Sequence, residues 1–210
     1  MPEKSNGPQS DSTMPLELLR TPPPKERADA ARNRAAVLDA AARLFAEHGV
    51  QHVSMDQVAA AAGVGKGTLF RRFGDKSGLA AALLDARERA LQEAILSGPP
   101  PLGPGAAPAD RIEAFLDAYL DHLLACLDLV RMSETAVPGA RYRIGSYRFW
   151  HHHLTILLAG TPDPQHTAHT LLAGLAADHI AALLPELGEQ RLREGARRLA
   201  RTVGPGAPAT

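Results

Sequence analysis

The chain has 210 residues, which is enough for one large or two small domains, and its 23 basic residues balance 23 acidic ones. Because aromatic residues make up only 4% of the chain while alanine and leucine are abundant, the composition favours an all-α fold. The single cysteine, Cys126, excludes an intramolecular disulfide. No apolar run reaches the roughly 18 residues that a membrane-spanning helix needs. The net charge of zero gives no sign of a nucleic-acid partner for the chain as a whole.

The first 28 residues are rich in proline, serine and glycine. Such a segment cannot bury enough apolar surface to offset the entropy lost on ordering, so residues 1–28 are predicted to form a disordered tail. They also lack the apolar core of a signal peptide, and together with the lone cysteine this predicts a cytoplasmic protein without a membrane partner.

Apolar residues then recur at helical spacing, and helices are expected at about 32–48, 54–63, 66–73 and 75–96. Gly49 closes the first of these helices, and Gly63 ends the second. Ser54 precedes the second helix, and Gln57 three residues later completes a capping-box pattern. Local signals therefore predict where these helices begin and end.

The second half begins with 97-SGPPPLGPGAAPAD-110, which cannot continue a helix and is predicted to be a flexible linker. Further helices are expected at about 111–130, 143–158, 165–184 and 186–202, followed by a disordered tail at 205–210. The helix at 165–184 is apolar on more than one side, which indicates burial against its own core and against a partner.

The run 63-GVGKGT-68 is similar at first sight to a phosphate-binding P-loop. The P-loop pattern would need a glycine at position 60 and a hydroxyl residue at position 67, but Ala60 and Gly67 stand there. The residues before the run read as an alanine-rich helix rather than the strand that the pattern requires. A nucleotide site is therefore not predicted.

The same residues fit a helix-turn-helix, because 54–73 contains two short helices joined by a turn with glycine. The polar side chains of the second short helix lie at its N-terminal end, where a recognition helix meets base edges in the major groove. The segment from Arg27 to Lys76 contains eight basic and five acidic residues, so its net charge is +3. This excess indicates phosphate binding, although a solvated charged face is the alternative interpretation.

Residues 32–79 resemble the DNA-binding module of the TetR family of bacterial transcriptional regulators. The resemblance rests on the helix ending in 44-LFAEHG-49 and on 54-SMDQVAAAAGVGKGTLFRRFGDK-76. It implies an all-α fold of about nine helices, with a three-helix DNA-binding domain at 29–75 and a helical regulatory and dimerisation domain at 76–204.

The function implied by the resemblance is that of a non-enzymatic repressor, without a cofactor, which a small-molecule ligand releases from double-stranded DNA. It further implies a homodimer, paired through the last two long helices, on a palindromic operator. The alternative is a helical protein-interaction module or a small-ligand-binding protein that does not bind DNA in a sequence-specific way.

The resemblance also implies which residues contact DNA: Ser54, Gly65, Lys66, Gly67, Thr68, Phe70, Arg71 and Lys76. Lys66 and Thr68 would reach bases or nearby phosphates. Phe70 stands where the family often has tyrosine, so it would pack on sugar or a thymine methyl group instead of donating to a phosphate. For Arg72, which follows the proposed phosphate ligand Arg71, a position on the surface or in an intramolecular ion pair is equally compatible.

The candidates for a ligand pocket in the second half are Phe115, Tyr119, His122, Tyr147 and Trp150, for which packing in the core is the alternative. No metal site is predicted, because three consecutive histidines at 151–153 cannot converge on one ion and His166 with His169 make only a partial site. Cys126 is expected to be a small buried apolar residue rather than a redox sensor.

Overall fold

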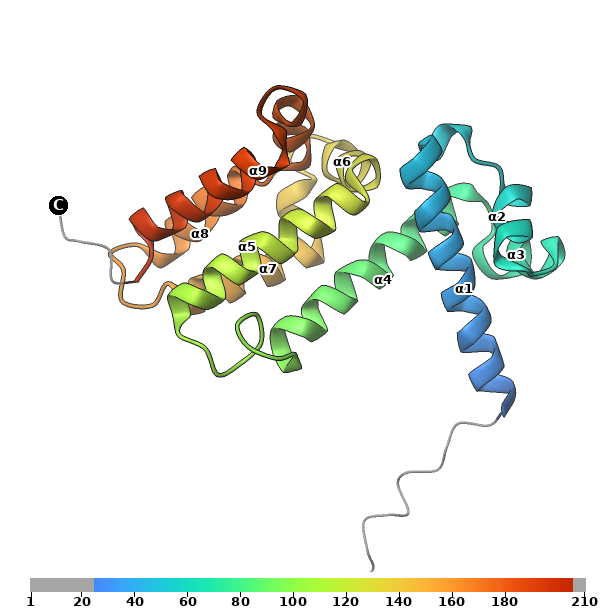
Figure 1. The fold of residues 1–210 in the computed structure, drawn as a ribbon, viewed down its shortest axis with the longest axis horizontal. Coiled ribbons are helices and arrows are strands. Elements are labelled where there is room, and N and C mark those ends of the chain that lie inside the picture. The colour runs from blue at the N-terminus through green and yellow to red at the C-terminus, as the bar shows by residue number, and fades with distance from the viewer. Residues whose placement is uncertain (1–24, 206–210) are drawn as a thin grey trace, which may run out of the picture.

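The computed structural model describes residues 25–205, and these residues contain α-helices, two short 3-10 helices and no strand (Figure 1). The helices are α1 (Lys25–His48), η2 (Val50–His52), α2 (Met55–Ala62), α3 (Lys66–Phe73), α4 (Lys76–Ser97), α5 (Pro108–Ala125), α6 (Leu127–Thr135), η3 (Arg141–Arg143), α7 (Gly145–Leu157), α8 (Pro164–Ala173) and α9 (Ala177–Val203). The predicted all-α class is confirmed. The predicted tails lie largely outside the described residues.

Helices α1, α2 and α3 form a compact group at one end of the molecule, and α4 runs from this group to the remaining helices (Figure 1). The group has its own apolar centre, to which α1 contributes Ala41, α2 contributes Val58 and α3 contributes Leu69. Leu79, at the start of α4, is fully buried against it. Helix α4 therefore belongs to both halves, since Leu91 and Ile95 near its other end are buried as well.

The boundaries of α2 follow from the residues at its two ends. The backbone N–H of Gln57 donates to Oγ of Ser54 (3.2 Å), and the backbone N–H of Ser54 donates to Oε1 of Gln57 (2.8 Å), which is the predicted capping box. Gly63 ends the helix with φ 65° and ψ 29°, a left-handed conformation that glycine adopts without the steric cost of a side chain.

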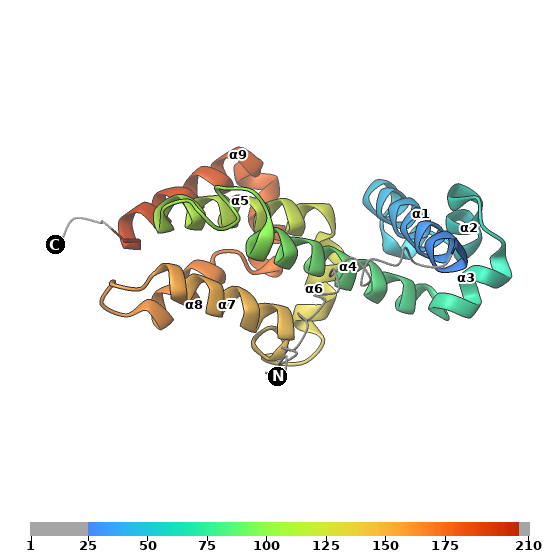
Figure 2. The same ribbon diagram turned by 90° about the horizontal axis from the view of Figure 1, so that it is seen from below.

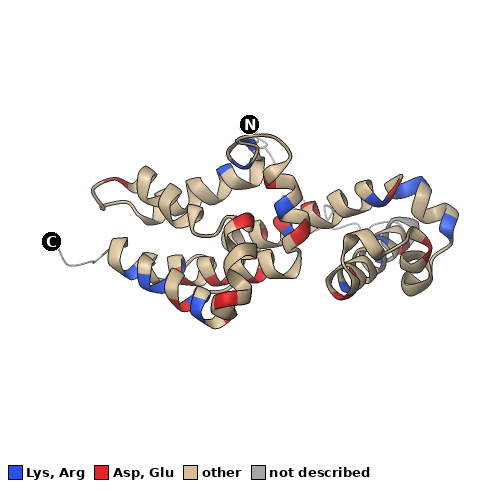
Figure 3. Cartoon of the chain, turned by 90° about the horizontal axis from the view of Figure 1, so that it is seen from above, with Lys and Arg blue, Asp and Glu red and all other residues tan. Residues whose placement is uncertain are grey.

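The second half of the molecule is built from two layers around an aromatic core. Figure 2 shows α5 beside α9 in one layer and α7 beside α8 in the other. Phe115 of α5 and Trp150 of α7 are fully buried between the layers, with their ring centroids 6.0 Å apart. Arginines of α9 form ion pairs with acidic residues of α5, so basic and acidic residues lie side by side on this pair of helices (Figure 3).

Five predicted boundaries were wrong. Helix α1 begins at Lys25 rather than near Arg32, so part of the predicted tail is helical. The predicted helix 111–130 begins earlier, at the favourable N-terminal position of Pro108, and is divided at Cys126, whose φ of −151° is not helical.

The two remaining differences concern the last helices. The predicted helix 165–184 is interrupted between α8 and α9 at residues 174–176. The expected boundary near Pro185 lies instead at Gly188, where φ is 73° and α9 bends. Glycine reaches this conformation easily, whereas Pro185 lies inside α9, where it removes one backbone hydrogen bond without ending the helix.

No single helix in residues 25–205 has both the length and the apolar character needed to cross a membrane. The bent pair of α8 and α9, at 53°, meets that requirement only when its two helices are taken together, by length and composition alone.

Candidate nucleic-acid interface and ligand pocket

Helix α3 is held by one apolar side chain and exposes most of the others. Leu69 is 1% exposed and anchors the helix in the centre formed with α1 and α2, whereas Lys66, Thr68 and Arg71 are exposed. Phe70, on the same helix, is 40% exposed. The face of α3 opposite Leu69 is therefore free to meet another molecule.

The glycines at the start of α3 leave its N-terminus open. A Cβ atom at Gly67 would meet nothing within 4 Å, and one at Gly65 would come only to 3.9 Å from Oγ1 of Thr68. Packing within the chain therefore does not require glycine at either position. An approaching surface could reach the backbone N–H groups of this turn without a side chain in the way.

Lys66 makes two contacts on this surface. Its Nζ lies 2.7 Å from Oδ2 of Asp56 on α2 and 5.9 Å from the ring centroid of Phe70. Because the side chains of Lys66 and Asp56 are 62% and 61% exposed, the ion pair contributes little to stability and exchanges easily for another partner. The contact holds the ammonium group beside the first turn of α3.

Lys76 and Ser54 are both placed next to η2, Lys76 by a hydrogen bond and Ser54 by its position in the chain. Nζ of Lys76, the first residue of α4, donates to the backbone carbonyl of Gln51 (3.0 Å), and the lysine is half-buried. Oγ of Ser54 donates to Oε1 of Gln57 (3.0 Å) and accepts from its backbone N–H. Both predicted phosphate contacts therefore come from side chains that the fold already holds in place.

Arg72 makes an intramolecular hydrogen bond to the backbone, where the sequence left open a surface position or an ion pair. Its Nη1 donates to the backbone carbonyl of Ala30 in α1 (2.9 Å) and so joins α3 to the helix that supports it. Arg71, the neighbouring residue, remains exposed. The structure thus separates two adjacent arginines that the sequence alone does not distinguish.

The five predicted pocket residues are all buried in the second half, and the rings of four of them pack against one another. Phe115 and Tyr119 have ring centroids 5.7 Å apart, and Tyr119 and Trp150 5.9 Å. The cavity beside Tyr119, His122, Tyr147 and Trp150 has a volume of only about 10 Å³, room for about one water molecule. Phe115 does not line this cavity and serves as a core residue.

Charged residues that the sequence analysis did not single out complete the wall of this cavity: Glu88, Glu134 and Arg141. Arg141 and Glu134 form an ion pair, and each side chain is 8% exposed. Glu88 of α4 accepts a hydrogen bond from Oγ of Ser146 (2.9 Å), and burial raises the pKa of its carboxyl group. The helical spacing of Glu88 from Leu84, Leu91 and Ile95 was the available signal, because it places a carboxylate on an apolar face.

The histidines and the cysteine of the second half are not arranged around an ion. No group of three or more histidine, cysteine, aspartate or glutamate residues in the described part of the chain could hold a metal. His169 stacks on His151 (3.9 Å between ring centroids) and its Nδ1 meets Oη of Tyr147 at 2.7 Å. Cys126 is buried, and this burial raises the pKa of its thiol to about 11.

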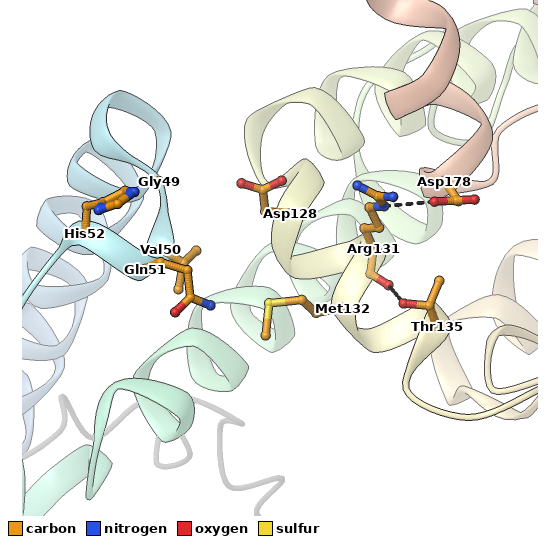
Figure 4. Close-up of a pocket in the computed structure, with 9 residues that line it drawn as sticks. All are labelled: Gly49, Val50, Gln51, His52, Asp128, Arg131, Met132, Thr135 and Asp178. Atoms are coloured by element: carbon orange, nitrogen blue, oxygen red, sulfur yellow. Dashed lines mark hydrogen bonds and ion pairs between the residues drawn. The ribbon is translucent and has the colours of Figure 1, made fainter.

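A larger cavity, of about 610 Å³, lies between the N-terminal group of helices and the second half (Figure 4). Residues 49–52 form one wall, and Asp128, Arg131, Met132 and Thr135 of α6 form the other. Nε of Arg131 donates to Oδ1 of Asp178 across the α6 side of the cavity (2.8 Å). Because α6 does not pack tightly on η2, the N-terminal group is not locked to α6 at this point.

Comparison with known proteins agrees with this arrangement. The sequence profile "Bacterial regulatory proteins, tetR family" matches residues 37–83. An HTH-type transcriptional regulator of Staphylococcus aureus (strain USA300) is 47% identical over 53 residues, which are 25% of this chain and 29% of that protein. The chain therefore matches less than a third of the length of this relative.

Solved structures extend the likeness of the fold to most of the chain. A putative TetR-family transcriptional regulator from Rhodococcus sp. has a TM-score of 0.62 at 21% identity, over 83% of this chain and 99% of that one. A putative transcriptional regulator from Saccharomonospora viridis, in complex with choline, has a TM-score of 0.64 at 19% identity, over 81% and 95%. The chain therefore carries the helix-turn-helix module of the tetR family of bacterial regulatory proteins, within a fold that it shares with TetR-family transcriptional regulators.

Proposed function

We propose that the protein is a transcriptional regulator that binds a palindromic operator as a homodimer and is released from it by a small organic ligand. The observation that carries the proposal is helix α3, which is anchored by Leu69 and presents Lys66, Thr68 and Arg71 on its free face. A short helix with polar residues at an open N-terminus fits the major groove of DNA.

The residues around α3 support a division between base reading and phosphate binding. Lys66 and Thr68 stand in the first turn of α3 and would reach base edges. Lys76 and Ser54 flank η2, so they would hold the phosphate backbone beside the groove. Binding to DNA requires Lys66 to exchange Asp56 for the nucleic acid, which its exposure allows.

The outer face of α8 and α9 supports the proposed homodimer. An apolar groove of about 240 Å³ lies there, lined by leucines that include Leu171, Leu183, Leu187 and Leu199. Leu199 is exposed in the single chain. A symmetric partner that covers this face would place two α3 helices on successive turns of one face of DNA.

A small ligand for the second half is supported by the buried polar cavity among α4, α5 and α7 and by the structural neighbour solved with choline. Helix α4 connects that cavity to the N-terminal group, because Glu88 and Lys76 lie on the same helix. A ligand that changes the position of α4 would therefore change the distance between the two α3 helices of a dimer.

The proposal is tested by selecting bound fragments from random duplex DNA with the purified protein. We expect enrichment of one palindromic sequence, with half-sites separated by about one helical turn or a multiple of it. Absence of any enriched sequence at moderate salt would contradict the proposal and favour a helical ligand-binding protein that does not read DNA.

Replacing Lys76 by alanine is expected to weaken binding by a similar factor for every DNA sequence, because a phosphate contact carries no sequence information. The slope of log affinity against log salt should decrease by about one. The measurement is a fluorescence anisotropy titration with operator and unrelated DNA between low and moderate salt. Arg89→Ala is the matched control, since Arg89 is an exposed charge on the same helix that pairs with Asp85.

Replacing Thr68 by alanine is expected to change which base is preferred in each half-site, at a cost of about 1 kcal/mol on the selected operator. Affinity for unrelated DNA should change little. Repeating the selection with the variant measures the preference directly. An unchanged selected sequence would show that Thr68 does not read bases.

A further inference from the structure

The cavity beside Trp150 contains one carboxylate that the protein itself does not neutralise. Glu88 reaches it from α4, and Tyr119, Tyr147 and Trp150 provide aromatic walls. Among residues 25–205, no lysine, arginine or histidine forms an ion pair with Glu88, and its recorded partner is the hydroxyl of Ser146 (2.9 Å). A half-buried carboxylate without a cationic partner is uncommon, because burial disfavours its charge.

The other charges at the cavity are already satisfied. Arg141 pairs with Glu134, and its Nη2 donates to the carbonyl of Leu172 (2.7 Å). The guanidinium carbon of Arg141 also lies 5.2 Å from the ring centroid of Tyr147. Arg141 is therefore not free to bind an anionic ligand, and Glu88 is the carboxylate of the cavity wall that forms no ion pair within residues 25–205.

The aromatic rings suit a positive charge for a separate reason. The faces of tyrosine and tryptophan rings attract cations, and this attraction is largest where water is excluded. One ring of the cavity, Tyr147, already accepts a cation in this way. The rings of Tyr119 and Trp150, 5.9 Å apart and inclined at 62° to each other, line the same cavity as Glu88.

We infer that this cavity is a binding site for an organic cation, whose charge is held by Glu88 and whose apolar part packs on Tyr119 and Trp150. This inference rests on the proposed function for the regulatory role of the ligand, but it does not depend on DNA binding for its test. The cavity of about 10 Å³ is closed around these side chains, so binding requires it to enlarge. The connection between α6 and α7, which supplies Arg141 and Ile144 to the wall, is the part of the wall that is not α-helical.

The chain offers a direct reporter of the site, because Trp150 is its only tryptophan. We would titrate the full-length protein with phenyltrimethylammonium, with its neutral isostere tert-butylbenzene and with the anion benzenesulfonate, and follow tryptophan fluorescence. We expect the cation to bind at least about tenfold more tightly than the neutral isostere, and the anion not to bind.

The decisive variant is Glu88→Gln, which keeps an oxygen for the hydroxyl of Ser146 and removes the charge. This variant should bind the cation no more tightly than the neutral isostere. Its affinity for the neutral isostere should equal that of the wild type, which would show that the cavity is intact. Glu93→Gln is the matched control, because Glu93 lies on the same helix but is exposed to solvent. It should retain the wild-type preference for the cation.

Three results would overturn the inference: no fluorescence response to millimolar cation, equal affinity of the wild type for the cation and its neutral isostere, or an undiminished preference for the cation in Glu88→Gln. Failure of the proposed function is recognised separately. If Glu88-dependent cation binding is found but random duplex selection enriches no sequence, the site stands and the DNA-binding role fails.

Discussion

Replacing Arg141 by methionine is expected to lower the free energy of unfolding by about 3–5 kcal/mol, because the change leaves the carboxylate of Glu134 buried without its cation. Both side chains are only 8% exposed, so solvent cannot take the place of the lost partner. Denaturant unfolding followed by circular dichroism measures the difference.

The position of the pair explains why its removal should affect several helices at once. Oε2 of Glu134 accepts from the backbone N–H of Ala177, the first residue of α9 (2.8 Å). Arg141 donates to the carbonyl of Leu172 in the last turn of α8 (2.7 Å). The carboxylate thus lies at a helix N-terminus and the guanidinium at a helix C-terminus, where the helix dipoles favour each charge.

Arg131→Met is the control for this experiment. Arg131 also lies near the start of α9 and pairs with Asp178, but the two side chains are 52% and 64% exposed. Its loss should cost less than about 1 kcal/mol. The double variant Glu134→Gln/Arg141→Met should be more stable than Arg141→Met alone, because no unpaired charge is left. Equal effects of Arg141→Met and Arg131→Met would show that the buried pair has no special role.

Acidification from pH 7 to pH 5 is expected to remove about 4 kcal/mol of stability through two buried histidines. Burial lowers the pKa of His122 to about 4, and burial together with the charge of Arg111 lowers the pKa of His153 to about 4. Nε2 of His153 is buried, and no atom of residues 25–205 forms a hydrogen bond with it. Protonation of either ring in the folded protein would bury an unpaired charge.

The sign of the effect follows from proton uptake. In the unfolded chain a histidine takes up a proton near pH 6.5, whereas these two rings stay neutral in the folded protein until about pH 4. Between these values the unfolded state binds more protons, so stability falls as pH falls through this window. The lowered pKa of Glu113, caused first by its hydrogen bond from Arg201, affects stability mainly below this range.

Denaturant unfolding at several pH values between 7 and 5 measures this loss. The variants His122→Asn and His153→Asn should each reduce the pH dependence, and the double variant should remove most of it. Glu88, whose raised pKa acts in the opposite direction, and His169, whose pKa is lowered, account for what remains. If the double variant keeps the slope of the wild type, other groups cause the acid sensitivity.

Helices α2, α3 and α4 could be predicted closely because their boundaries depend on nearby residues, whereas the start of α1 could not. Ser54 and Gln57 cap α2, Gly63 takes up the left-handed conformation that ends it, and Asp75 accepts from the backbone N–H of Gly78 at the start of α4. Each of these contacts spans three residues or fewer. The prediction of a helix-turn-helix at 54–73 needed no information from the rest of the chain.

The second half was predicted less well because tertiary contacts decide its boundaries. Cys126 interrupts a run of apolar residues that reads as one helix, and neither glycine nor proline marks the break. The turn there allows Leu129 and Val130 of α6 to reach the core. The partners of Glu88, Glu134 and Arg141 lie on other elements, so sequence spacing could reveal at most the position of Glu88 on an apolar helix face.

The ion pairs between α5 and α9 have a further consequence for how these helices are aligned. Arg193, Arg197 and Arg201 recur every four residues on α9, and their partners Asp121, Asp117 and Glu113 recur every four residues on α5. A slide of α9 by one turn, about 5.4 Å, would bring most of the arginines to an acidic residue again. Because the ion pairs repeat at equal intervals, they do not determine by themselves how far α9 is shifted along α5. The alignment of α9 on α5 is determined by apolar contacts, above all by those of Ala200 on α9, which is buried against the core.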